Sequence, residues 1–173
     1  MLTASPAPTL SPRERGILLD LARASIQHGL HHHQPLPVDP RDYPESLQAL
    51  RATFVTLEKQ GQLRGCIGTL IAHQPLVQDI AAHAYAAAFD DPRFPELVAE
   101  EFAHLELHIA VLSPPEPLHF DSEDALLAQL RPGIDGLILQ STRAVTAIRV
   151  AHKPREQGQS GYNLRRLVRL WLN

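Results

Sequence analysis

Apolar residues recur at helical spacing in two long segments of this chain. From Pro12 to about Gly29 they form the stripe of an amphipathic helix, and Ser11, Pro12 and Glu14 supply a cap, a first-turn proline and a capping box. Gly29 is the expected stop, and the proline-rich segment 31–44 is expected to be a loop. An alanine-rich stretch predicts a second helix over residues 75–89.

Strand patterns fill much of the rest of the chain. Residues 53–59 are rich in strand formers, 60–62 predict a turn and the following apolar run predicts the return strand of a β-hairpin. Residues 105–111 alternate apolar and polar positions, which is typical of a half-buried strand. Further on, the pattern predicts a short helix from Ser122 to Leu130, strands over 137–139 and 144–151, and a basic helix over 162–172. Hairpins with interspersed helices favour an α+β fold.

The return strand carries the candidate chemistry. It contains the only cysteine, Cys66, between Gly65 and Gly68, and glycine inside a strand indicates a bulge or a close approach to the backbone. Strict alternation would place Arg64 and Cys66 on one face, where a guanidinium favours the thiolate. We therefore expect an anion or substrate surface here, kept uncrowded by the glycines. The alternative is that Cys66 is a small buried strand residue and Arg64 a surface arginine.

Histidines give no metal motif. His28, His31, His32 and His33 are interpreted as loop residues, and His104 and His108 would lie about 13 Å apart in a strand. We expect no metal and no cofactor. A Cys–His pair would need a partner from elsewhere in the fold, for which His73, His83 and His108 are the candidates.

Composition is typical of a soluble globular protein. The 173 residues suffice for one domain, or one domain with two lobes, and a single cysteine excludes an internal disulfide. No apolar run is long enough to span a membrane and no secretory signal is recognised, so a cytoplasmic protein is expected. Residues 1–140 carry 9 Lys/Arg against 18 Asp/Glu, whereas residues 141–173 carry 7 against 1. The acidic body argues against a nucleic-acid partner.

Several motifs resemble the AMMECR domain family, whose bacterial and archaeal members are called AmmeMemoRadiSam system protein A. They are Leu63–Thr69 with the preceding strand 53–59, Asp91–Pro95, Val111–Glu116 and Leu130–Leu139. The resemblance implies an α+β domain with an antiparallel sheet flanked by helices and a smaller second lobe. It also implies two partners, a Memo-like protein and a radical SAM enzyme.

Within this resemblance, Cys66 is the candidate catalytic residue. The candidate substrate-binding residues are Arg64, Gly65, Gly68, Thr69, Asp91 and Arg93. The turn holding Asp91 and Arg93 is either a pocket wall or a loop in which the arginine pairs with a neighbouring carboxylate. The chain is then an enzyme or accessory enzyme subunit; the alternative is a non-catalytic binding module for a nucleotide, RNA or a protein.

The resemblance ends near residue 140. We predict an AMMECR-type domain over residues 1–140 and a divergent basic tail over 141–173, which lacks the family's usual continuation. The tail is a divergent segment, a segment with a new role or a frameshifted reading of the gene, and we favour the frameshift.

Overall fold

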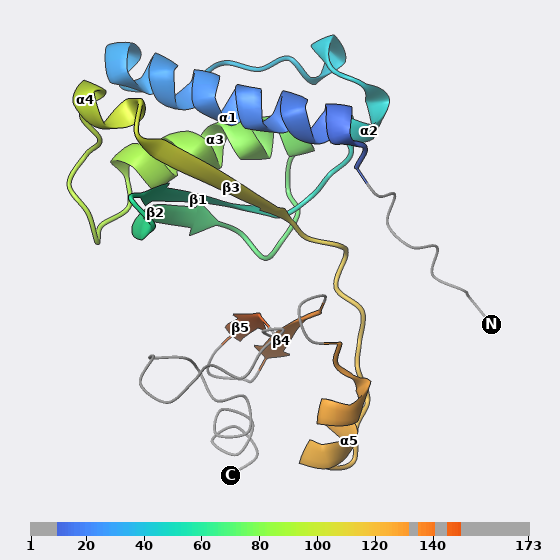
Figure 1. The fold of residues 1–173 in the computed structure, drawn as a ribbon. Coiled ribbons are helices and arrows are strands. Elements are labelled where there is room, and N and C mark those ends of the chain that lie inside the picture. The colour runs from blue at the N-terminus through green and yellow to red at the C-terminus, as the bar shows by residue number, and fades with distance from the viewer. Residues whose placement is uncertain (1–9, 132–134, 141–144, 150–173) are drawn as a thin grey trace. The chain divides into compact units, whose positions relative to one another are not determined.

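The chain forms two compact units, Met1–Pro114 and Pro115–Asn173. The structure, a computed structural model, describes residues 10–131, 135–140 and 145–149 (Figure 1). Most of the predicted basic tail, including the helix expected over 162–172, lies outside the described residues. None of the described helices is long and apolar enough to cross a membrane.

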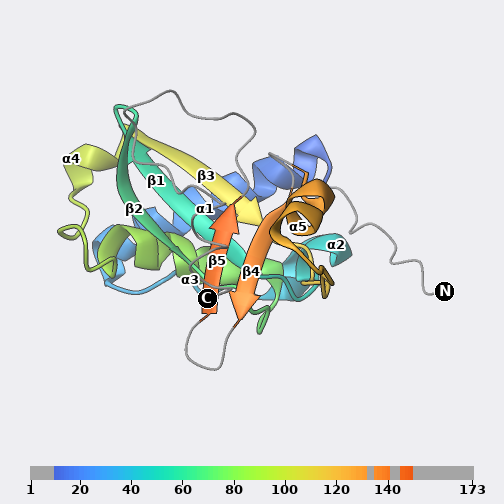
Figure 2. The same cartoon turned by 90° about the horizontal axis from the view of Figure 1, so that it is seen from below.

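The first unit is a three-stranded antiparallel sheet with helices on one face. Its strands are β1 (Thr53–Lys59), β2 (Gln62–Gly68) and β3 (Leu105–Val111), in the order β2-β1-β3 (Figure 2). The long helices α1 (Pro12–His32) and α3 (Leu76–Phe89) lie on the same side of this sheet (Figure 1). The short elements are η1 (Pro40–Asp42), α2 (Glu45–Gln48) and α4 (Ala99–Phe102).

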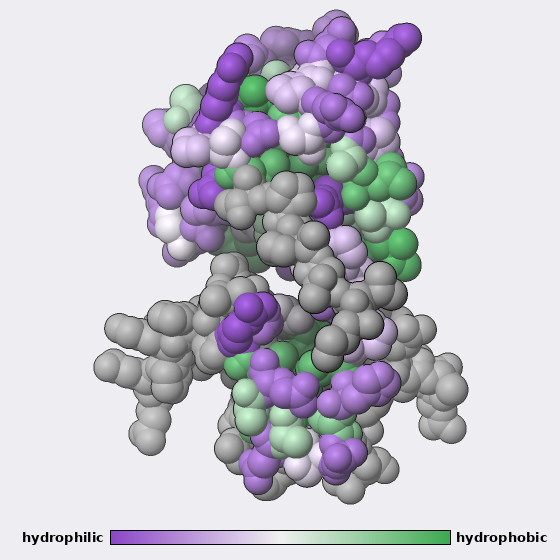
Figure 3. All heavy atoms as spheres, turned by 90° about the vertical axis from the view of Figure 1, so that its right-hand side faces the viewer, coloured by the Kyte–Doolittle hydropathy of each residue, from purple (hydrophilic) through white to green (hydrophobic). Residues whose placement is uncertain are grey.

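The core lies between this sheet and the two long helices. Val55 and Leu57 of β1 are fully buried, as are Leu18 and Ile26 of α1 and Ile80 of α3. The small side chains of α3 allow the helix to approach the sheet closely. The other face of the sheet carries the alternating polar positions. On the face of the molecule drawn in Figure 3, hydrophilic side chains cover the upper part of the first unit, and apolar side chains show beneath them and in a group at the lower right.

Helix α1 begins as predicted but ends later than predicted. Ser11 Oγ accepts from the Glu14 backbone N–H and the Glu14 carboxylate accepts from the Ser11 N–H, which completes the capping box. The expected stop at Gly29 is wrong, because the helix continues to His32 and is capped by His33, whose φ of 53° is left-handed. Gly29 is instead a packing position: a Cβ there would lie 2.6 Å from the Phe89 ring and 2.7 Å from the Tyr85 ring.

The hairpin of β1 and β2 contains a bulge that the sequence pattern did not predict. Leu57 pairs with Gly65, whereas Glu58 pairs with Leu63, so Arg64 is one extra residue on β2. Such an insertion interrupts the alternation of side chains along the strand.

In the residues that the structure describes, the second unit combines one helix with a β-hairpin. Helix α5 (Glu123–Gln129) is capped by Ser122, and strands β4 (Gly136–Gln140) and β5 (Val145–Arg149) pair antiparallel. Leu126 and Leu137 form its small core, with Phe120 and Leu130 packed against them. The α+β class and the smaller second lobe are thus confirmed.

Candidate functional site

Cys66 lies on the face of the sheet opposite the helices. It pairs with Thr56, whose neighbours Val55 and Leu57 point into the core, so both Thr56 and Cys66 point the other way. The Thr56 hydroxyl donates a hydrogen bond to the Cys66 sulfur over 3.2 Å. Cys66 is half-buried, so the thiol is neither sealed in the core nor fully exposed.

The Asp91–Arg93 clamp, formed by these two side chains, holds the backbone of Cys66. The Cys66 N–H donates to Asp91 Oδ2 over 2.9 Å, and Arg93 Nη2 donates to the Cys66 carbonyl over 3.0 Å. Since β2 is an edge strand of the described sheet, no described strand lies beside it on that side to pair with these groups. The clamp therefore takes the place that another strand would occupy.

The clamp is itself a bidentate ion pair. Arg93 Nε and Nη2 donate to the two oxygens of Asp91 over 2.9 and 2.6 Å. These bonds from Arg93, together with the Cys66 N–H, hold the pKa of Asp91 well below its usual range although burial opposes the shift. Of the two interpretations of this turn, the arrangement matches the one in which the arginine pairs with a neighbouring carboxylate. Arg93 nevertheless remains 54% exposed at its side chain.

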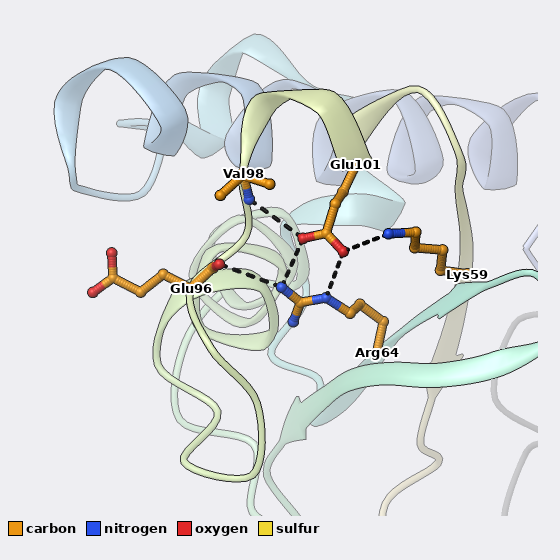
Figure 4. A network of polar contacts seen from close by, with 5 residues as sticks. All are labelled: Lys59, Arg64, Glu96, Val98 and Glu101. Carbon is orange, nitrogen blue, oxygen red and sulfur yellow. Dashed lines mark hydrogen bonds and ion pairs between the residues drawn. The ribbon is translucent and has the colours of Figure 1, made fainter.

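Arg64 does not share a face with Cys66, and that expectation was wrong. The bulge turns Arg64 towards α4, where Nε and Nη2 donate to Glu101 over 3.2 and 2.9 Å (Figure 4). Nη2 also donates to the Glu96 carbonyl, and Lys59 Nζ donates to Glu101 over 2.8 Å. Hydrogen bonds from Arg64 and Lys59 lower the pKa of Glu101 to about 2. Arg64 is thus a buried structural cation in this structure.

At the two glycines near Cys66, the space that a side chain would occupy is taken by other backbone atoms of the protein. The uncrowded surface expected from these glycines is therefore not formed. A Cβ at Gly65 would lie 2.0 Å from the Ala87 carbonyl oxygen of α3. A Cβ at Gly68 would lie 2.3 Å from the Thr53 carbonyl oxygen. Thr69 continues this packing, because its N–H donates to the same Thr53 carbonyl over 2.9 Å.

A buried polar network links α3 to the start of β1, and the sequence pattern did not single it out. Asp79 is fully buried, and its Oδ2 accepts from the Thr53 hydroxyl over 2.6 Å and lies 3.1 Å from His83 Nδ1. Burial acts to raise the pKa of Asp79, but hydrogen bonds from His83, Thr53 and Gln74 outweigh it and the pKa is lowered. The spacing of Asp79 and His83, four apart on a predicted helix, was the available signal.

No histidine is recorded in contact with the Cys66 sulfur in the part of the chain that the structure describes. His83 faces Asp79 and Thr53, His73 Nδ1 lies 3.1 Å from the Ile71 carbonyl, and His108 Nε2 lies 3.7 Å from a Glu58 oxygen. The expected loop histidines His31 and His32 belong to the last turn of α1. Cys66 therefore has a hydroxyl neighbour, Thr56, rather than an imidazole.

The clamp, the bulge and the hairpin coincide with the motifs that carry the family resemblance. The AMMECR1 family model matches residues 19–162, and the chain belongs to the AMMECR1 family. A protein of Methanothermobacter thermautotrophicus is 40% identical over 131 residues, covering 76% of this chain and 68% of that relative. A protein of Thermotoga maritima is 48% identical over 83 residues, covering 46% of this chain and 48% of that relative.

A solved structure supports the fold as well as the family. The crystal structure of the uncharacterised protein PH0010 from Pyrococcus horikoshii is similar with a TM-score of 0.68 at 33% identity. The similarity covers 76% of this chain and 66% of that one. This chain thus spans about two thirds, or somewhat less, of the length of the relatives from Methanothermobacter, Thermofilum and Thermococcus.

Proposed function

We propose that this AMMECR1-family chain is component A of a three-protein system with a Memo-like protein and a radical SAM enzyme. It acts there as an enzyme or accessory subunit, in the cytoplasm, where a free thiol stays reduced. The family resemblance motivates the partners. The observation that carries the site is the clamp, which fixes the Cys66 backbone on both sides while Thr56 orients its sulfur.

The residues of the site have separate roles in this proposal. Cys66 contacts or attacks the substrate, and Asp91 positions Cys66. Arg93, exposed on one side, holds an anionic group of the substrate, since a guanidinium pairs well with carboxylate or phosphate. Gly65, Gly68 and Thr69 hold the strand in place beside Cys66 through close packing against the Ala87 and Thr53 carbonyls, and Arg64 anchors the bulge.

Reconstitution of the three purified proteins tests this proposal. Cys66→Ser should keep the fold and the binding to both partners but abolish the stimulation of 5′-deoxyadenosine formation by the radical SAM enzyme. Arg93→Lys should retain part of the activity, whereas Arg93→Ala should lose most of it. Full activity of Cys66→Ser would remove the chemistry from the thiol, and the absence of binding to both partners would overturn the assignment to the system.

A second candidate is a binding module without chemistry of its own. It is favoured by one observation, namely that no described histidine contacts the sulfur to serve as a base. In that case the Cys66 face would hold a nucleotide, RNA or a protein partner. Both functions allow Cys66→Ser to keep its ligand, so activity distinguishes them: a binding module should keep full activity of the system in Cys66→Ser, whereas the first function predicts its loss.

A further inference from the structure

We propose that Glu58, Glu106 and His108 form a binding site for one divalent transition-metal ion such as Zn²⁺. The three residues come from the two neighbouring strands β1 and β3. Glu58 pairs directly with Glu106, and His108 lies two residues further along β3. All three therefore lie on the face of the sheet away from the core, to which Leu57 and Leu107 contribute.

The donor atoms are close enough to bind a common ion. The nitrogen of His108 and one oxygen of each carboxylate all lie within 4.8 Å of one another, and His108 Nε2 lies 3.7 Å from Glu58 Oε2. Zinc–nitrogen and zinc–oxygen bonds of about 2.0–2.1 Å place tetrahedral ligands about 3.4 Å apart. The observed separation exceeds a hydrogen bond but needs only a small side-chain rotation to reach that value.

The two carboxylates of Glu58 and Glu106, which lie opposite each other on neighbouring strands, also favour a bound cation. Like charges directly opposite each other on neighbouring strands destabilise a sheet. Among the described residues, no hydrogen bond or ion pair is recorded for the Glu106 side chain, and the His108 imidazole is the one side-chain partner recorded for Glu58. Lys59, the nearest lysine in sequence, pairs with Glu101 instead. A bound dication would neutralise both carboxylates at once.

The ligand set determines the kind of ion. An imidazole with two carboxylates favours transition metals such as Zn²⁺ over Mg²⁺ and Ca²⁺, which take oxygen ligands. Three protein ligands leave a position for water or a further ligand. Cys66 and His108 are both register partners of Thr56, one on each side of it, so the open position would face the same side of the sheet as the thiol.

Calorimetric titration of the full chain, freed of any histidine tag, with Zn²⁺ tests the proposal. We expect saturable binding of one ion, with affinity reduced at least about tenfold in Glu106→Gln and in His108→Ala. The matched controls Glu100→Gln and His104→Ala change an exposed residue of the same type nearby and should bind as the unaltered chain does. Circular dichroism of each variant verifies the fold, which exposed positions should preserve.

Two further measurements distinguish binding at this site from binding by other metal-ligating side chains, namely the helix-end histidines and the thiol. Replacing His31 and His32 together by Ala removes the helix-end histidines and should leave the affinity unchanged. Co²⁺ bound at this site should show no sulfur-to-metal charge-transfer absorption, because no thiolate takes part. The proposal is overturned if Glu106→Gln and His108→Ala bind Zn²⁺ like their controls, if no saturable binding occurs, or if a Co²⁺–thiolate band appears.

Discussion

Glu101→Gln is the substitution that best tests the ion cluster formed by Lys59, Arg64 and Glu101. The change keeps the size of the side chain but removes the carboxylate that accepts from Arg64 and Lys59. Arg64 is only 9% exposed, and its Nη1 has no hydrogen-bond partner within the described residues, so the guanidinium depends on this one carboxylate for charge compensation. Loss of one partner leaves an uncompensated buried charge.

The magnitude follows from the pKa of Glu101. A carboxyl whose pKa falls from 4.5 to about 2 on folding gains at most about 3 kcal/mol at neutral pH, and solvent at the partly exposed Lys59 reduces this towards about 2 kcal/mol. Breaking a buried ion pair typically costs about 3–5 kcal/mol. We therefore expect Glu101→Gln to lose roughly 2–4 kcal/mol of unfolding free energy.

Urea denaturation measures this loss, with Glu100→Gln, an exposed change on the same helix, as the control. Because the folded pKa lies below the unfolded one, the stabilisation is fully present above pH 4.5 and is lost as the pH falls towards 2. The unaltered chain should therefore lose more stability across that window than Glu101→Gln does. A loss of less than about 0.5 kcal/mol, with the same acid dependence in both proteins, would refute the reasoning.

Three further substitutions probe the packing of β2, an open position on α1 and the clamp. Gly65→Ala should cost about 3 kcal/mol or more of unfolding free energy or prevent folding, because its Cβ meets the Ala87 carbonyl; native-like thermal unfolding would contradict this. Gly16→Ala, which meets nothing within 4 Å on α1, should instead raise the unfolding free energy by up to about 1 kcal/mol in the same assay. Asp91→Asn should speed amide hydrogen exchange at Cys66, since the acceptor loses its charge and its arginine; unchanged protection would argue against the clamp.

Local signals predicted the elements of the fold well. The capping box of α1, the hairpin over β1 and β2 and the alternating strand β3 all depend on residues adjacent in the chain, which the sequence displays directly. The end of α1 did not follow from such a signal. Gly29 resembles a helix stop in the sequence, but its missing side chain admits the rings of Tyr85 and Phe89 from another helix.

The geometry around Cys66 did not follow from the sequence. A one-residue bulge reversed the expected side of Arg64, and nothing in the local pattern distinguishes a bulged strand from a regular one of the same composition. Asp91 accepts from the Cys66 N–H and Arg93 donates to the Cys66 carbonyl, and these bonds link residues about 25 apart in sequence. The group of Glu58, Glu106 and His108 requires strand register, which the spacing of histidines alone cannot supply.

The rate of alkylation of Cys66 in the folded chain tests the central claim most directly, because the protein has a single cysteine to follow by mass spectrometry. If the clamp and Thr56 present the thiol for use, iodoacetamide should modify it in the folded state, with a rate that rises with pH and falls in Asp91→Asn. A thiol that stays unmodified until the chain unfolds would contradict the account.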